Sequence, residues 1–97
     1  MKITDIRCEI LKQPTIEMVG DGSQDTVVIF VDTDAGITGI GEVDSSPYVV
    51  KTIVECPASH MACMGLKEIL IGEDPLDVER LWRKMYEKAS TTADAAW

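Results

Sequence analysis

The sequence predicts an α+β domain in which a three-stranded antiparallel meander is followed by helices. Two stretches, Ile3–Lys12 and Thr26–Val31, are rich in the apolar and β-branched residues that suit a pleated strand. A third, Ile37–Val43, follows a turn sequence and has the length of a returning strand. From Asp44 onward, apolar residues recur at helical spacing. Strands that precede helices in this way are typical of the α+β class.

The stretch Thr26–Val43 is central to this prediction and is interpreted as a β-hairpin. Its first strand is apolar on both faces, which predicts a central strand covered on both sides. The residues of the two faces are Val27, Ile29 and Val31 on one and Val28 and Phe30 on the other. Asp32–Gly36 supplies the turn, because Gly36 can adopt the positive φ that ends such a loop. Gly39 and Gly41 share one face of the returning strand, which predicts close approach by a packed helix or side chain.

The first strand alternates apolar and polar residues, as expected of a half-buried edge strand. Ile6, Cys8 and Ile10 share one face, and Pro14 ends the strand. A long connection, Gln13–Asp25, follows and contains loop-forming glycines together with apolar residues, namely Ile16, Met18 and Val19. One interpretation is a lid that closes on a bound molecule, which predicts that residues 15–25 are the most mobile internal segment without ligand. The other is a loop that packs its apolar residues on its own core.

Two helices are predicted directly after the hairpin. The first begins with Ser46 as N-cap and Pro47 at the first helical position, where the missing N–H has no cost. Its apolar stripe is formed by Val49, Ile53 and Cys56, and Pro57 ends it. A short second helix is expected over Gly65–Gly72, closed by its final glycine.

The clearest helix is Asp74–Ala89. Asp74 is expected to cap it, with Pro75 at the first position and the negative charge of Asp77 in the first turn. Its apolar face consists of Val78, Leu81, Trp82, Met85 and Ala89. That face is longer than a small sheet can cover. We therefore expect Leu81, Trp82 and Met85 to pack partly on the sheet and partly on something outside residues 1–97.

Composition excludes several classes of function. The 97 residues suffice for one small domain, and the net charge is −8, which argues against nucleic acid or an anionic membrane as partner. No apolar run approaches the roughly 20 residues that span a bilayer. Cys8, Cys56 and Cys63 form no Cys-x-x-Cys pair and are interpreted as reduced thiols of a cytoplasmic protein. The only histidine, His60, is interpreted as a packing or surface residue rather than a ligand.

Several motifs, in their order along the chain, resemble the N-terminal capping domain of the enolase superfamily, in its mandelate racemase and muconate lactonizing branch. The hairpin contributes Thr33-Asp34-Ala35-Gly36 and Gly39-Ile40-Gly41-Glu42. Gly65–Trp82 and Lys84-Met85-Tyr86 look like the stretch that precedes the barrel in that family. The resemblance covers nearly all of residues 1–88. It implies a capping domain over residues 1–89, with residues 90–97 as a truncated or atypical tail where a (β/α)8 barrel would begin.

The resemblance also implies a function. In this family the absent barrel binds Mg²⁺ and carries the bases that remove a proton α to a carboxylate. The expected enzyme is an acid-sugar dehydratase or racemase, and this chain alone is expected to bind no metal and to be catalytically inert. Two loops of the cap set substrate choice, and they correspond to Pro14–Asp25 and Asp44–Tyr48. The residues expected to contact substrate or exclude water are Ile16, Met18, Val19, Gly20, Asp21, Ser45, Ser46 and Tyr48.

Two alternatives remain open. The Ser46 hydroxyl could serve only as a helix cap. The whole chain could instead be a stand-alone α+β interaction module that docks through the face of Val78, Leu81, Trp82 and Met85. Under the capping-domain interpretation the expected partners are a carboxylate or sugar-acid substrate and either the missing barrel domain or a second copy of the chain.

Overall fold

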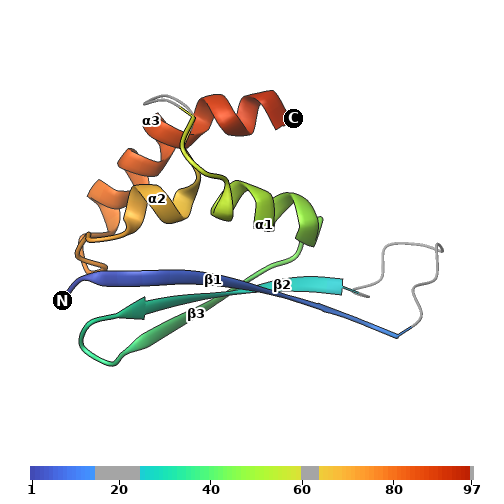
Figure 1. Ribbon diagram of the computed structural model, residues 1–97, viewed down its shortest axis with the longest axis horizontal. Coiled ribbons are helices and arrows are strands. Elements are labelled where there is room, and N and C mark those ends of the chain that lie inside the picture. The colour runs from blue at the N-terminus through green and yellow to red at the C-terminus, as the bar shows by residue number, and fades with distance from the viewer. Residues whose placement is uncertain (15–24, 60–63, 97) are drawn as a thin grey trace.

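The computed structural model describes residues 1–14, 25–59 and 64–96 and has the predicted α+β architecture (Figure 1). The strands are β1 (Ile3–Lys12), β2 (Asp25–Thr33) and β3 (Thr38–Val43). The helices are α1 (Pro47–Glu55), α2 (Leu66–Leu70) and α3 (Val78–Ala96). The strands form one antiparallel sheet in the order β1-β2-β3, so the meander is confirmed with β2 at its centre. All three helices lie on one side of the sheet (Figure 1).

The hairpin turn forms as its sequence predicts. The Thr33 N–H donates to the Ile37 carbonyl at 3.1 Å, and the Thr33 hydroxyl donates to the same oxygen at 2.7 Å. Gly36 adopts a φ of 75°, a left-handed conformation that costs little without a Cβ. The turn therefore fixes the register in which Val31 lies opposite Gly39.

A register shift in β1 lets the N-terminus join the helical layer. Thr4 is an extra residue relative to β2, since Ile3 lies opposite Thr33 while Asp5 lies opposite Asp32. Ile3 and Ile6, three residues apart, are consequently both buried under the helices. The backbone of Ile3 then bonds to the α2–α3 connection: its N–H donates to the Glu73 carbonyl, and its carbonyl accepts from the Gly72 N–H, both at 2.8 Å.

The core lies between the helices and one face of the sheet. Its buried apolar residues are Ile3, Ile6, Cys8, Val27, Val54, Ile69, Leu81 and Ala89. The prediction that β2 is covered on both sides is wrong for the described residues, because the helices cover a single face. Val28 and Phe30 on the other face are only half-buried, and the Arg7 guanidinium lies 4.7 Å from the Phe30 ring centre.

The buried face of α1 differs from the predicted stripe. Pro47 and Val54 are buried and Val50 packs against the core, whereas Val49 and Ile53 are only half-buried. Pro47 is at the first helical position, as predicted, and its side chain is buried. The helix is therefore oriented so that positions 47, 50 and 54 face the core. Apolar residues occur on both sides of this short helix, so its sequence pattern did not fix its rotation.

The α3 helix begins later than predicted. The Asp74 carboxylate accepts a hydrogen bond from the Leu76 N–H at 2.9 Å, and the Asp77 N–H donates to the Asp74 carbonyl at 3.1 Å. Asp74–Asp77 is therefore a turn, and Asp77 accepts the first helical bond, from the Leu81 N–H at 3.0 Å. The sequence is compatible with either start, because Pro75 fits the second position of a four-residue turn as well as the first position of a helix.

Two side chains of the predicted α3 face, Val78 and Trp82, are largely exposed. Leu81 and Ala89 are buried and Met85 is half-buried, but Trp82 is 61% exposed. Its indole stacks on the Tyr86 ring, with centres 5.5 Å apart and planes 12° apart. The expectation that Trp82 packs partly on the sheet is thus wrong within the described part of the chain.

Candidate functional site

The ends of the three strands that lead to the expected substrate loops lie at one end of the sheet. β1 ends at Lys12, directly opposite Asp25, where β2 begins. β3 ends at Val43, and residues 44–46 lead into α1. Figure 1 shows the end of β1 and the start of β2 together, far from the hairpin turn. The topology therefore brings both flanks of the 14–25 connection and the strand-to-helix turn into one region.

The strand-to-helix turn is held at both of its ends. The Thr26 hydroxyl donates to the Val43 carbonyl at 3.2 Å, and Pro47 is buried in the core. The Val50 N–H donates to the backbone carbonyl of Ser46 at 3.1 Å. The Ser46 hydroxyl itself makes no capping bond to α1, so capping does not occupy this side chain. Ser45 and Ser46 are both exposed on this fixed backbone.

Tyr48 contacts a residue that the sequence interpretation missed. The Lys12 ammonium donates to the Tyr48 phenol oxygen at 3.2 Å and lies 5.8 Å from the ring centre. Tyr48 is 56% exposed. The pair joins the end of β1 to the start of α1 and places a positive charge at Tyr48, two residues after Ser46 in the chain. The sequence did contain a signal for Lys12 as a site residue: it is a cation at the last residue of a strand, directly before a long loop, in an acidic chain.

This arrangement suits an anionic, hydroxylated molecule. An ammonium group, a phenol and two hydroxyls can all donate hydrogen bonds to carboxylate oxygens. The remaining predicted site residues, Ile16, Met18, Val19, Gly20 and Asp21, lie outside the described residues, as does almost all of the segment predicted to be most mobile. Their expected role in excluding water therefore stays a prediction.

Three further features of the described residues bear on the chemistry that they could support. No group of three or more His, Cys, Asp or Glu side chains converges there as a metal site. Burial raises the pKa of the Cys8 thiol, which keeps it protonated and unreactive at neutral pH. None of the helices in residues 1–14, 25–59 and 64–96 has the length and apolar content needed to cross a bilayer. Cys63 and His60 lie outside these ranges.

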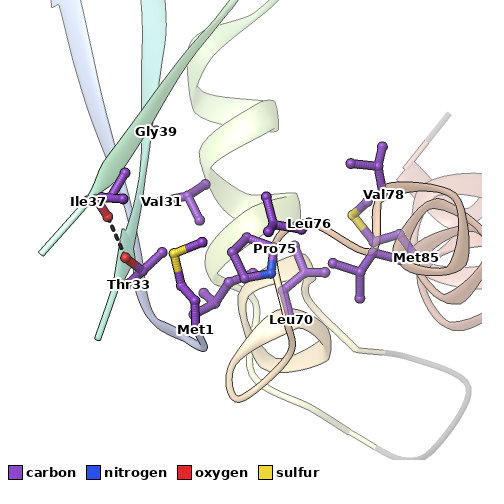
Figure 2. Close-up of a pocket in the computed structure, with 12 residues that line it drawn as sticks. Met1, Val31, Thr33, Ile37, Gly39, Leu70, Pro75, Leu76, Val78 and Met85 are labelled. Carbon is purple, nitrogen blue, oxygen red and sulfur yellow. Dashed lines mark hydrogen bonds between the residues drawn. The ribbon is translucent and has the colours of Figure 1, made fainter. Parts of the chain in front are cut away.

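A concave feature lies away from the strand-to-helix turn, beside the hairpin turn (Figure 2). It is an apolar groove of about 390 Å³ between the β2–β3 hairpin and the α2–α3 connection. Its lining residues are Met1, Ile3, Val31, Thr33, Ile37, Gly39, Leu70, Pro75, Leu76, Val78, Leu81 and Met85. We call it the hairpin groove. The predicted close approach to Gly39 and Gly41 is wrong, because a Cβ at either position would meet no atom of the described chain within 4 Å.

Comparison with models of known protein families shows which family this chain is related to. The family model for the mandelate racemase / muconate lactonizing enzyme N-terminal domain matches residues 3–97. The chain belongs to this family. The resemblance found in the hairpin and in the Gly65–Trp82 stretch is thereby confirmed, and the domain is the N-terminal cap of mandelate racemase-like proteins. No curated protein sequence matches the chain significantly.

Solved structures of mandelate racemase-like proteins share this fold. A crystal structure described as a predicted mandelate racemase from Rhodobacter sphaeroides matches 93% of the chain, with a TM-score of 0.83 and 26% identity. A protein assigned as a racemase matches 92%, with a TM-score of 0.76 and 26% identity. A protein assigned as a mandelate racemase from Bordetella bronchiseptica RB50, complexed with 2-oxoglutarate/phosphate, matches 88%, with a TM-score of 0.65 and 29% identity. The capping domain spans only 24%, 21% and 23% of those three chains.

Proposed function

We propose that this capping domain supplies substrate-binding side chains to an enzyme that removes a proton α to a carboxylate, as an acid-sugar dehydratase or racemase of the cytoplasm. The observation that carries the proposal is the Lys12–Tyr48 pair beside Ser45 and Ser46. These groups come from two separate elements, the end of β1 and the turn into α1, that the Lys12–Tyr48 hydrogen bond joins. Membership of the mandelate racemase and muconate lactonizing family supports the reaction class.

The chemistry divides between the cap and the rest of the enzyme. Family relatives imply Mg²⁺, which would stabilise the enediolate formed when the proton leaves. The described residues of the cap do not fit such a metal site, so no catalytic step is assigned to them. The cap instead binds the substrate. The Lys12 ammonium balances a carboxylate of the substrate, and the hydroxyls of Ser45, Ser46 and Tyr48 orient its hydroxyl groups.

The Bordetella relative supports a carboxylate as the substrate class. It is described as complexed with 2-oxoglutarate/phosphate, and 2-oxoglutarate carries two carboxylates. A cation in the cap would strengthen the binding of such a carboxylate by a charge-assisted hydrogen bond. Lys12 is an exposed cation in contact with Tyr48, in a chain whose net charge is −8.

The experiment compares Lys12→Met with Lys2→Met in the enzyme that contains this domain and its barrel, assayed with Mg²⁺ and a library of sugar acids. Both variants remove one exposed positive charge, but Lys2 lies at the opposite end of β1. A charge-assisted hydrogen bond contributes about 1.5–3 kcal/mol, so Lys12→Met should raise KM roughly tenfold or more. Lys2→Met should leave KM unchanged. Equal KM values for the two variants would refute the role of Lys12, and turnover of no sugar acid would refute the substrate class.

The exposed aromatic pair on α3 supports a proposal about the partner of the cap. Trp82 and Tyr86 are stacked and largely exposed, and Val78 beside them is exposed as well. We infer that this face contacts either the barrel or a second copy of the chain. The alternative of a stand-alone interaction module uses the same surface. Light scattering of the 97-residue chain, mixed with a separately produced barrel domain, distinguishes these possibilities. A 1:1 complex indicates contact with the barrel, a dimer of the chain indicates a second copy, and neither species leaves the stand-alone module.

A further inference from the structure

One side-chain hydrogen bond holds the backbone just before the strand-to-helix turn. The Thr26 hydroxyl donates to the Val43 carbonyl at 3.2 Å, and both residues are half-buried. Val43 is the last residue of β3, and residues 44–46 follow it directly. The bond therefore acts on the end of the turn that precedes Ser45 and Ser46.

The other end of the turn is held without help from a polar side chain. Pro47 is buried in the core, and the Val50 N–H donates to the Ser46 carbonyl at 3.1 Å. The Ser46 hydroxyl makes no capping bond, and Ser45 and Ser46 are exposed. Since this end is anchored on α1, the position of the two serines depends on how firmly the end of β3 is held.

Thr26 lies where the three strands meet at this end of the sheet. It pairs with Leu11 of β1, one residue before Lys12. The residue after it, Val27, pairs with Val43 of β3. The Thr26 hydroxyl is thus a side-chain link between β2 and β3, next to the strand end that carries the cation of the proposed site.

We propose that Thr26 is a positioning residue, whose hydroxyl holds the end of β3 so that Ser45 and Ser46 meet the hydroxyl groups of the substrate. The inference rests on the proposed function, in which these two serines orient a hydroxylated carboxylate. In this role Thr26 does not contact the substrate. Its effect passes through the serines, so it favours acids that carry hydroxyl groups over acids that lack them.

The experiment is a double-mutant cycle in the enzyme that contains this domain and its barrel, assayed with Mg²⁺ and the sugar acid that gives the highest kcat/KM. Thr26→Val removes the hydroxyl but keeps a β-branched side chain, which suits a strand. Loss of one neutral hydrogen bond should raise KM about threefold to tenfold and leave kcat nearly unchanged, because binding rather than chemistry is weakened. In the background of Ser45→Ala with Ser46→Ala, Thr26→Val should raise KM no further.

Two controls separate positioning from general damage to the fold. Thr26→Ser keeps the hydroxyl and loses only the methyl group, so its KM should equal that of the wild type. The second control is the straight-chain acid of the same carbon number without hydroxyl groups, measured as a competitive inhibitor. Its inhibition constant should be equal in the wild type and in Thr26→Val, because the serines have no hydroxyl to bind there.

The outcomes separate this inference from the proposed function. An unchanged KM in Thr26→Val overturns the positioning role, and so does a rise that persists after both serines are replaced. An equal loss of affinity for the hydroxylated and hydroxyl-free acids, or a KM in Thr26→Ser as high as in Thr26→Val, also overturns it. If no sugar acid is turned over, or if replacing both serines leaves KM unchanged, the proposed function fails and this inference fails with it.

Discussion

Gly65 is the position where adding a single methyl group should damage the domain most. It is buried, and its N–H donates to the Cys56 carbonyl at 3.1 Å. A Cβ built there would overlap that same carbonyl oxygen and lie 2.9 Å from the Cys56 nitrogen and 3.0 Å from the Val54 carbonyl. These are backbone atoms at the end of α1, where the Cys56 N–H is bonded to the Thr52 carbonyl at 2.8 Å. They cannot move aside as a flexible side chain would.

Gly65→Ala should therefore cost more than an ordinary overpacked core substitution. Overpacking costs about 1–3 kcal/mol, and a backbone clash belongs at the upper end, at about 3 kcal/mol. For a domain of this size each kcal/mol lowers Tm by roughly 4–8 °C, which predicts a fall of about 12–24 °C. Urea and thermal unfolding followed by far-UV circular dichroism measure it. Gly41→Ala is the matched control, because its Cβ meets nothing within 4 Å, and it should gain about 0.5–1 kcal/mol. A Gly65→Ala domain as stable as wild type would refute the reasoning.

Three further predictions concern the sheet and α3. Hydrogen bonds from Arg7, and to a smaller extent from Thr38, lower the pKa of Asp32 in the folded domain. The ionised carboxylate therefore stabilises the fold fully at pH values above its pKa in the unfolded chain, about 4, and this stabilisation is lost as the pH falls below that value. Asp32→Asn should flatten that acid loss in urea midpoints measured from about pH 2 to 7, and an unchanged slope would contradict it. Val27 is fully buried at 0% exposure, so Val27→Ala should cost about 2 kcal/mol or more in urea unfolding, and a cost below about 0.5 would be inconsistent with a core role. Trp82→Ala should cost less than about 1 kcal/mol while reducing self-association in sedimentation, and a large loss of stability without any change in mass would contradict the surface role.

The sheet could be predicted because local sequence determines it. Ile6 and Cys8 alternate with charged residues, and the Asp32–Gly36 turn fixes the hairpin without help from distant contacts. Two features depended instead on which surfaces meet in space. The second face of β2 looked buried because Val28 and Phe30 are apolar, yet no helix of the described chain covers it. The glycines of β3 suggested a packed neighbour where the described chain has an open groove.

The candidate site could be predicted only in part for the same reason. Ser45, Ser46 and Tyr48 were found through the family motif, which places the turn after the hairpin. Lys12 was missed because its contact with Tyr48 spans 36 positions and depends on the strand register and on how α1 leaves the sheet. Trp82 was placed on the sheet because helical periodicity identifies an apolar face but does not say how wide a part of it the core covers.

The two hydrogen bonds of Ile3 impose an order on synthesis. The β2–β3 hairpin is local and can form as soon as residue 43 has left the ribosome. The first residue of β1, in contrast, reaches its partners only when Gly72 and Glu73 have emerged. Part of the strand made first therefore forms its hydrogen bonds late. Nascent chains stalled with residue 60 outside the exit tunnel should leave the N-terminus open to protease, whereas chains with residue 80 outside should protect it. The start of β1 thus joins the α2–α3 connection after β2, β3 and α2 have been synthesised and before α3 (Val78–Ala96) is complete.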